Sequence, residues 1–398
     1  MSQFESRRVI EALRSGIPSR IVGQYFTGTR EKLLSSINDN IQSATEGSSS
    51  GMIITGKYGE GKTHLLNTVF SAAGNKNLVV SILPLSKETP FDKLPVIYQK
   101  LMANTYLPNR EQPGFLHEFE DKMQDSRFAA DLILFASTSL SCNKLSFLLK
   151  NHTKEKDAEE IHKLQTDLLG DFISNPELKK RYRLLFKETL KFNENFAKTK
   201  HILDYFEFMS YLFLKLGYDG WVILFDEAEL IGRMSKNPRL KAYQNMNLFL
   251  NPAKTLHSTF TLFAFTSSYT EDVIESKHDF ENLEAVYPEG NPAIKSSLNA
   301  ILKAPQLQPL NNQEIRKVID TIIQIYADAY NWTPEVSSEV IQKQTDSSGF
   351  LLRTKLRTCI EILDQLYQYG EYGTIHTGQL SEEAYEEDIP DLNQESVE

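Results

Sequence analysis

Cysteine is scarce in this sequence of 398 residues. It has two, Cys142 and Cys359, and they lie far apart in the chain. Two cysteines at this separation build neither a disulfide framework nor a metal site of the usual Cys spacing. Such low usage is typical of proteins that work in a reducing compartment.

Long apolar runs are also missing. No stretch of the chain approaches the ~20 consecutive apolar residues that a membrane-spanning helix needs. The N-terminal segment MSQFESRRVIEALRSG has no apolar core of the length found in signal peptides. We therefore expect a soluble protein of the cytoplasm that does not act in a membrane.

The chain has no excess of positive charge. It has 43 Lys and Arg residues and 53 Asp and Glu residues, which gives a formal net charge of −10. Proteins dedicated to wrapping nucleic acids are usually basic, so the bulk charge does not favour that role. A local basic patch stays open, because electrostatic steering depends on where the charges lie.

The chain is longer than the size at which one hydrophobic core usually stops growing, so two or more lobes are expected. Its composition is that of a globular protein. Apolar runs at 52–55, 78–83, 221–225 and 260–265 predict buried strands, and the strand–helix–strand order at 52–83 predicts a parallel sheet. The expected class is α/β, a parallel sheet flanked by helices. We predict the following parts: N-terminal helices at 1–45, a core that holds the sheet at 46–104 and 201–305, a helical insertion at 105–200, a C-terminal helical lid at 306–376, and an acidic mobile tail at 377–398.

Three helix predictions can be checked residue by residue. The segment 4–15 should form an amphipathic helix with Phe4, Val9, Ile10 and Leu13 on one face, ending at Gly16. A second helix should begin near Thr29 and run to about residue 44. Helices are also expected from Asn311, a candidate N-cap, and over 352–366, with Leu352, Leu356, Ile360 and Leu363 on the inner face.

A glycine-rich loop follows the first strand. It fits the pattern G-x-x-x-x-G-K-[ST] at every defined position, and its residues are Gly56, Lys57, Tyr58, Gly59, Glu60, Gly61, Lys62 and Thr63. Gly56 and Gly61 are expected to adopt positive φ and let the backbone N–H groups approach a phosphate. Lys62 should reach the β- and γ-phosphates, and the Thr63 hydroxyl should bind Mg²⁺. With His64 in the first turn of the next helix, the loop predicts binding of a nucleoside triphosphate, with ATP expected.

Two acids end the strand at 221–225. Asp226 and Glu227 come directly after the apolar run, where a side chain reaches the ligand crevice of a parallel sheet. Asp226 is expected to hold Mg²⁺, and Glu227 to orient or deprotonate the attacking water. An ordinary strand that ends in a solvated acidic turn is the alternative. Beside the glycine-rich loop, the pair favours a hydrolysing ATPase in which turnover drives a change of shape.

Further candidates carry less specific signals. Thr266, followed by Ser267, ends the strand at 260–265 and is a candidate to hydrogen-bond the γ-phosphate or the attacking water; a simple turn is the equal alternative. Arg353, with Arg357 one turn later, is a candidate lid arginine that pairs with the γ-phosphate, against the alternative of a solvated helix face. Arg233 and Arg239 are candidates for a finger that reaches a neighbouring subunit.

Taken in order, these elements resemble the AAA+/STAND branch of P-loop ATPases, in which a G-R-E box like that at Gly28 precedes the first strand. The resemblance implies an α/β P-loop NTPase fold of AAA+/STAND type, with 46–104 and 201–305 as its ATPase core. Two further segments, Asp226-Glu227-Ala228-Glu229 with Arg239-Leu-Lys-Ala-Tyr243, and Glu5 to Arg14, resemble the ATP-binding proteins of bacterial BREX-type defence systems. The resemblance covers roughly residues 1–366. It implies protection from phage beside a helicase-like or nuclease partner that works on DNA. No arginine lies between Ser268 and Lys303, where the family's neighbour-sensing finger usually sits, so assembly into a ring stays open, as does any homo-oligomer.

Two functions therefore compete. The first is a Mg²⁺-dependent ATPase that acts as a switch or motor, with DNA contacted directly or through the partner. The second is a nucleotide-gated scaffold with little hydrolysis of its own. A kinase is disfavoured, because no motif for a second substrate accompanies the loop.

Overall fold

The structure is a computed structural model that describes residues 2–16, 20–25, 30–252, 255–347, 351–373 and 375. The chain forms two compact units, each made of segments far apart in sequence. The first unit is Met1–Lys32, Gly56–Ser71 and Leu307–Glu398, and the second is Leu33–Thr55 and Ala72–Gln306. The division runs through helices α3 (Glu31–Thr45) and α4 (Lys62–Asn75).

A five-stranded sheet in the order β1-β5-β4-β2-β3 forms the centre of the second unit. The strands are β1 (Ser50–Gly56), β2 (Val79–Pro84), β3 (Thr105–Tyr106), β4 (Trp221–Asp226) and β5 (Thr259–Thr266). β4 pairs in parallel with β2 and with β5, which confirms the expected parallel pairing for these strands. The sequence did not predict β3, a two-residue strand antiparallel to β2, because so short a strand has no apolar period to detect.

The middle strand, β4, is buried along its whole length, as parallel strands covered on both faces are. The indole N–H at the start of this strand has a hydrogen-bond partner inside the core: Trp221 Nε1 donates to Ser81 Oγ on β2 at 2.8 Å. Ser81 Oγ also lies 2.7 Å from Thr105 Oγ1 on β3, so side-chain hydrogen bonds tie three strands together. Buried polar groups are usually paired in this way, because an unpaired one destabilises the fold.

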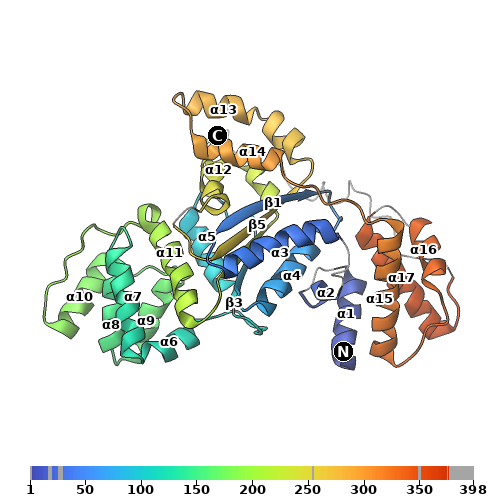
Figure 1. The fold of residues 1–398 in the computed structure, drawn as a ribbon, viewed down its shortest axis with the longest axis horizontal. Helices are drawn as coiled ribbons and strands as arrows, with labels where there is room; N and C mark the ends of the chain where they lie inside the picture. The colour runs from blue at the N-terminus through green and yellow to red at the C-terminus, as the bar shows by residue number, and fades with distance from the viewer. Residues whose placement is uncertain are drawn as a thin grey trace, which may run out of the picture. The chain divides into compact units, whose positions relative to one another are not determined.

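Besides parts of α3 and α4, the described residues of the second unit form the helical segments from α5 to α14, and Figure 1 shows α6 to α10 grouped in one bundle. The segments are α5 (Leu94–Ala103), α6 (Leu116–Met123), α7 (Ser126–Thr138), α8 (Lys144–Lys154), α9 (Ala158–Leu168), α10 (Asn175–Phe186), α11 (Lys198–Leu216), the 3₁₀ helix η1 (Ala228–Arg233), α12 (Lys236–Leu250), the π-helix η2 (Thr270–Glu275), α13 (Asp279–Val286) and α14 (Pro292–Leu302). One continuous apolar core runs from the sheet into the bundle, from Ile53 through Phe119 and Leu164 to Ile301.

The first unit has its own apolar core, built from helices at both ends of the chain. These are α1 (Gln3–Ser15), α2 (Arg20–Gly23), α15 (Asn312–Tyr330), α16 (Ser338–Ser347) and α17 (Leu352–Tyr369). α1 packs on α15 and α17, and Arg14 Nη2 donates to Asp364 Oδ1 at 2.7 Å. The chain's N-terminal helix and its C-terminal helices therefore fold as one body.

Most of the helix predictions for this unit are confirmed. α1 ends at Gly16 as expected, and Asn311 caps α15 by accepting hydrogen bonds from the backbone N–H groups of Gln313 and Glu314. Ile360 and Leu363 of α17 are buried, while Leu352 and Leu356 are partly buried. Thr29 and the tail at 377–398 lie outside the described residues.

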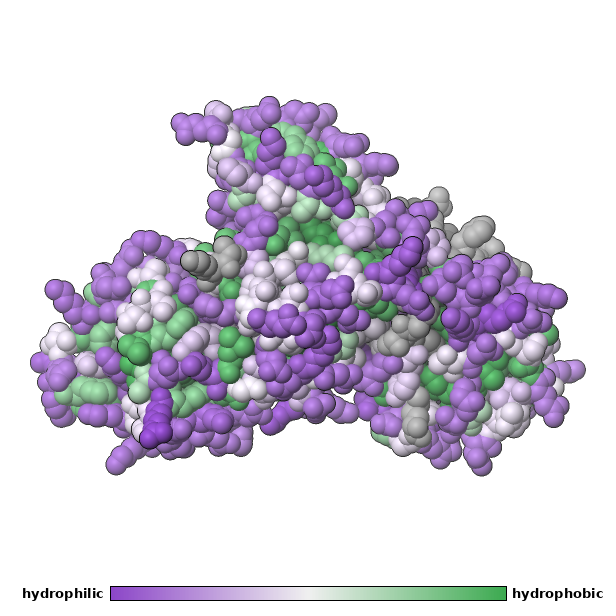
Figure 2. All heavy atoms as spheres, in the orientation of Figure 1, coloured by the Kyte–Doolittle hydropathy of each residue, from purple (hydrophilic) through white to green (hydrophobic). Residues whose placement is uncertain are grey.

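One prediction in α1 is wrong. Phe4 is 70% exposed, and Ser6 takes the buried place beside Val9, Ile10 and Leu13. A helix turns about 100° per residue, so the five positions between Phe4 and Val9 rotate Phe4 away from the buried face. Hydrophilic residues cover much of the molecular face in Figure 2, and among the described residues Phe4 is one of several large hydrophobic side chains that are nevertheless exposed, with Leu134 and Tyr369.

Candidate functional site

The glycine-rich loop joins the end of β1 to the start of α4, as the sequence predicts. Gly59 (φ +74°) and Gly61 (φ +92°) lie in the left-handed region, which confirms Gly61 but not Gly56. Gly56 is required for space instead, because an added Cβ would lie 3.1 Å from Leu307 Cβ and 3.3 Å from Lys62 Cγ. The loop therefore turns at Gly59 and Gly61 and packs tightly at Gly56.

Lys62 is buried at the first position of α4, with 8% of its surface exposed. Its Nζ donates to the carbonyl oxygens of Gly56 at 3.1 Å and Lys57 at 3.4 Å, which folds the side chain over the loop. Glu60 closes the loop from the other side, since its Oε2 accepts from Lys57 N at 2.7 Å. A buried ammonium beside exposed loop residues is an arrangement that favours an anionic ligand.

Thr63 and His64 lie in the first turn of α4, and both side chains are partly buried. Their backbone N–H groups belong to the helix N-terminus, where partial positive charge accumulates. Leu65 N already donates to Gly61 O at 2.9 Å, so the helical hydrogen bonding begins within the loop itself.

Arg30 contacts the loop and was not among the predicted site residues. Its Nη2 donates to Glu60 O at 2.5 Å and its Nε to Gln308 O at 3.3 Å. Its backbone, at φ +58°, donates from N to Glu314 Oε1 at 3.1 Å. Burial lowers the pKa of the Arg30 guanidinium, although Glu60 and Glu314 oppose the shift. The sequence signal was present, because Arg30 is the arginine of the box that precedes the first strand.

A cavity of about 490 Å³ lies beside the loop within the first unit. Its walls combine charged and apolar side chains from the loop, from Arg30 and from the starts of α15 and α17: Arg30, Lys57, Tyr58, Glu60, Pro309, Leu310, Asn312, Ile315, Leu351, Leu352 and Lys355. Its volume falls within the ~300–1,000 Å³ range of small-molecule and cofactor sites.

Arg353 lies at the start of α17, close to the same loop. Its guanidinium carbon is 5.8 Å from the centre of the Tyr58 ring, and Tyr58 is 39% exposed. The Cδ atoms of Arg353 and Arg357 lie 3.5 Å and 3.1 Å from where a Cβ would stand at Gly16. The structure thus brings Arg353 and the loop together within one unit.

Asp226 and Glu227 stand at the end of β4 in the second unit. Asp226 is 5% exposed, its Oδ1 accepts from Glu227 N at 3.0 Å, and its carbonyl oxygen accepts from Leu85 N at 2.9 Å. Glu227 is partly buried, with φ +55° and ψ +34°. A left-handed backbone costs a residue with a Cβ about 1–2 kcal/mol, and such strain concentrates at functional sites.

Thr266 ends β5, the parallel neighbour of β4, and its side chain is partly buried. The pairing of Phe225 with Phe263 sets the register, so the residues after both strands lie at one edge of the sheet. The second unit therefore brings Asp226, Glu227 and Thr266 to a common edge. The Mg²⁺ site expected from Thr63 and Asp226 combines residues of the two units and stays a prediction.

The proposal of Arg239 as an intersubunit finger is wrong. The residue is 3% exposed, and its Nη2 donates to the buried Asp279 at 2.6 Å. Although burial opposes the charge, the hydrogen bonds to Asp279 raise the pKa of the Arg239 guanidinium. Arg233 is exposed and stays a candidate.

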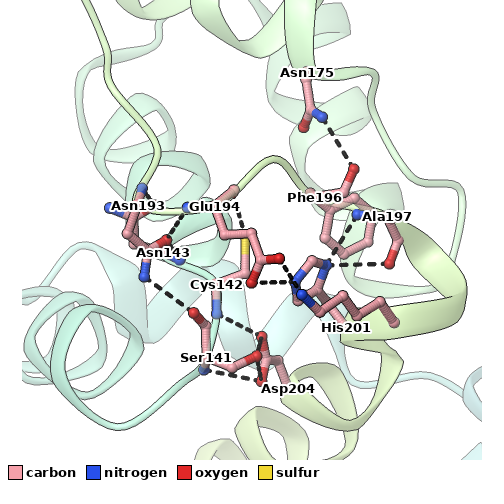
Figure 3. A network of polar contacts seen from close by, with 11 residues as sticks. Ser141, Cys142, Asn143, Asn175, Asn193, Glu194, Phe196, Ala197, His201 and Asp204 are labelled. Carbon is pink, nitrogen blue, oxygen red and sulfur yellow. Dashed lines mark hydrogen bonds and ion pairs between the residues drawn. The ribbon is translucent and has the colours of Figure 1, made fainter.

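A second polar cluster joins the loop before α8 to α11, as Figure 3 shows. It places Cys142, His201 and Glu194 near one another, which raises the question of a nucleophilic site. Cys142 is 2% exposed, burial raises the pKa of its thiol, and its Sγ donates to Glu194 O at 3.3 Å. Asp204 accepts from the backbone N–H groups of Ser141 and Cys142. An inert thiol and carboxylates used as loop anchors are the features of a structural clamp.

The described helices include none that is both long and apolar enough to cross a membrane. Within the same residues, no group of three or more His, Cys, Asp and Glu side chains is placed to hold a metal ion. Mg²⁺ needs no such cluster, because it is usually held by one or two carboxylates and the phosphates of its substrate.

A mostly parallel sheet whose first strand leads through a glycine-rich loop into a helix is consistent with a P-loop nucleotide-binding protein. Comparison with known families is more specific. The chain belongs to the BREX system ATP-binding protein BrxC/D family, which it matches over residues 1–123 and 179–380. Membership confirms the resemblance and implies ATP binding and a role in a phage-defence system. No curated protein sequence matches the chain significantly.

Proposed function

We propose that this protein binds Mg²⁺ and ATP through the loop Gly56–Thr63 and hydrolyses the nucleotide as a switch or motor subunit of a bacterial BREX system. The single observation that carries the proposal is the loop itself. It has two glycines in the left-handed region, a buried Lys62 folded over its carbonyls, and a helix that begins at the same lysine. These features meet the needs of a triphosphate, which is a large, flexible anion.

The first unit supplies the nucleotide-holding groups. The backbone of Gly56 to Gly61 wraps the phosphates, Lys62 reaches the β- and γ-phosphates, and His64 continues the helix N-terminus. The cavity beside Tyr58 and Leu352 receives the nucleoside, for which its mixed charged and apolar walls are suited. The Thr63 hydroxyl and the Asp226 carboxylate are the residues that would hold Mg²⁺, which would supply positive charge to neutralise the phosphates.

The second unit supplies the hydrolytic groups. Glu227 orients or deprotonates the attacking water, and Thr266 contacts the γ-phosphate or that water. The left-handed backbone of Glu227 supports this assignment. Glycine would adopt this conformation without strain, so the presence of a glutamate there suggests that its carboxylate is needed. In the first unit, Arg353 at the start of α17 senses the γ-phosphate, and its position over the ring of Tyr58 in the loop supports this role. Release of phosphate removes its partner and frees the helix to move.

The protein acts in the cytoplasm with a helicase-like or nuclease partner, and DNA is contacted directly or through that partner. Membership of the defence family supports this setting.

Calorimetry and phosphate release test the proposal. Lys62→Ala should weaken binding of Mg·ATP by about 100-fold, since charge-assisted hydrogen bonds to phosphate are among the strong ones. Lys317→Ala is the matched control: it removes an exposed lysine of α15 in the same unit, one that is in neither the loop nor the cavity lining, and should change affinity by less than about threefold. Glu227→Gln should bind ATP as wild type does and lose turnover by about 100-fold or more. Flat calorimetry with wild type would rule the proposal out.

A nucleotide-gated scaffold is the second candidate. The sequence has no arginine between Ser268 and Lys303, and Arg239 is buried against Asp279, so neither supplies a finger to a neighbour. On this account wild type binds ATP and turns it over negligibly until DNA or a partner arrives. Phosphate release with and without duplex DNA, at saturating ATP, separates the two candidates.

A further inference from the structure

A buried ion pair lies in the second unit next to the segments that follow β4 and β5. Arg239 of α12 and Asp279 of α13 are 3% and 0% exposed. The guanidinium donates from Nη2 to Asp279 Oδ1 at 2.6 Å and from Nε to both carboxylate oxygens, at 3.0 and 3.1 Å. Such a forked pair has one well-defined geometry, so it fixes the groups attached to it.

The pair is joined to the segment after β4. Arg239 Nη1 donates to Met234 O at 2.7 Å, and Met234 ends the 3₁₀ helix η1 that begins immediately after Glu227. Within η1, Gly232 packs so closely that an added Cβ would lie 2.5 Å from Val273 Cγ2 and 3.1 Å from Tyr269 Cε2. Lys277 Nζ donates to Gly232 O at 2.9 Å. η1 is thus fastened at its end and along its side.

The same pair is joined to the segment after β5. Tyr243 donates its hydroxyl proton to Asp279 Oδ2 at 2.8 Å. Having used its single proton, it accepts from Tyr269, whose oxygen lies 2.8 Å away. Tyr269 is 1% exposed and follows the strand end Thr266-Ser267-Ser268 directly. Burial raises the pKa of both phenols, so both remain neutral donors at physiological pH.

We propose that Arg239, Asp279, Tyr243 and Tyr269 are positioning residues, which hold the strand-end segments carrying Glu227 and Thr266 in one fixed geometry. The inference rests on the proposed hydrolysis and gives a role to the Arg239–Tyr243 motif, which the proposed function leaves unused. These four residues act through others and do not touch the nucleotide. Their removal should therefore lower kcat and leave KM and nucleotide affinity unchanged.

A similar network elsewhere in the same unit provides the control. Lys144 Nζ of α8 lies 2.6 Å from Asp167 Oδ2 of α9, and Tyr205 of α11 donates to Asp167 Oδ1 at 2.5 Å. Tyr205 is 1% exposed, as Tyr269 is, and its hydroxyl likewise serves a buried ion pair. Its hydroxyl bonds Lys144 and Asp167 and its ring packs on Tyr98, Phe172 and Phe196, none of which is a candidate site residue. Loss of its hydroxyl therefore removes a buried hydrogen bond without loosening the segments that carry Glu227 and Thr266.

The experiment compares Tyr269→Phe with Tyr205→Phe in the full chain. Both keep the ring and lose one buried hydroxyl. Tyr269→Phe should lower kcat by roughly 10- to 100-fold, since small displacements of reacting groups have effects of that order. KM and the affinity for Mg·ATP should stay within about twofold. Tyr205→Phe should lower the melting temperature to a similar extent and leave kcat unchanged.

A second variant separates a loss of positioning from a general loss of folding. Arg239→Lys keeps the charge and loses the fork. It should bind Mg·ATP normally and show reduced kcat, and adding Tyr269→Phe to it should lower kcat by less than the product of the single effects. Equal losses of kcat in Tyr269→Phe and Tyr205→Phe, or wild-type kcat in Tyr269→Phe, would overturn the inference while leaving hydrolysis intact. A wild type that binds ATP and never turns it over would overturn both.

Discussion

Two buried ion networks in the second unit are each built on a cation–carboxylate pair bonded to a tyrosine hydroxyl, and they occupy different places in the fold. Lys144, Asp167 and Tyr205 tie together α8, α9 and α11. Arg239, Asp279, Tyr243 and Tyr269 tie α12 and α13 to the segments that follow β4 and β5. A buried salt bridge is by itself weak evidence for stability or function, because desolvation offsets much of the attraction. Both networks are buried and polar, so it is the segments restrained by the Arg239 network that support the functional role proposed for it.

The two networks also differ in the cation. Lys144 is an ammonium that can lose its proton, and burial lowers its pKa even though Asp167 opposes the shift. Arg239 is a guanidinium, which stays charged in proteins. When its carboxylate is removed, the first network can lose its buried charge because Lys144 can release a proton. The second network keeps the buried charge of Arg239.

Removing the carboxylates should give the largest effect. Asp279→Ala leaves Arg239 buried and charged, so we expect the free energy of unfolding to fall by about 3–5 kcal/mol. Asp167→Ala should lower it less, because Lys144 can become neutral. Denaturant unfolding of both variants, analysed for the second unit's transition, measures the difference. Equal losses would mean that Lys144 stays charged, and the distinction between the cations would fail.

The pH dependence of Asp167→Ala should give an intermediate effect. The folded-state pKa of Lys144 lies below its unfolded value of about 10.5, so between the two values the unfolded state binds the additional proton. Stability therefore rises with pH across that window, by at most about 1.4 kcal/mol per pH unit for one proton. Removal of Asp167 lowers the pKa further and widens the window. Below pH 10.5 we expect its unfolding free energy to rise with pH more steeply than that of Asp279→Ala; parallel profiles would contradict this.

The sequence predicted well wherever the signal was local. The loop pattern fits within eight residues, the strand at 221–226 is one apolar run, and Asn311 caps the helix beside it. The errors concern phase and detail: Phe4 points away from the core, and Gly56 is required for close packing where positive φ was expected.

Long-range partners could not be predicted. Arg239 reads as an exposed arginine of a polar helix until the fold brings Asp279 of another helix against it. Arg30 contacts the glycine-rich loop from a segment that precedes the first strand. Neither partner lies within one or two helical turns, so no period or spacing reveals it. Burial and pairing in the folded chain decide these roles.

The smallest expected effect is the change in unfolding free energy when backbone strain is relieved at Glu227, which directly precedes the segment that the Arg239 network restrains. Glu227 has a left-handed backbone at φ +55°, directly before the segment that ends at Met234. Glycine adopts this conformation without steric cost, so Glu227→Gly should raise the free energy of unfolding by about 1 kcal/mol while hydrolysis is lost. Glu227→Gln, which keeps the Cβ, should lose hydrolysis with no gain in stability, and it serves as the matched control. In the Tyr269→Phe background the segment is less restrained, so the gain from glycine should shrink. An undiminished gain there would show that the strain at Glu227 arises from the strand end alone, independently of the network.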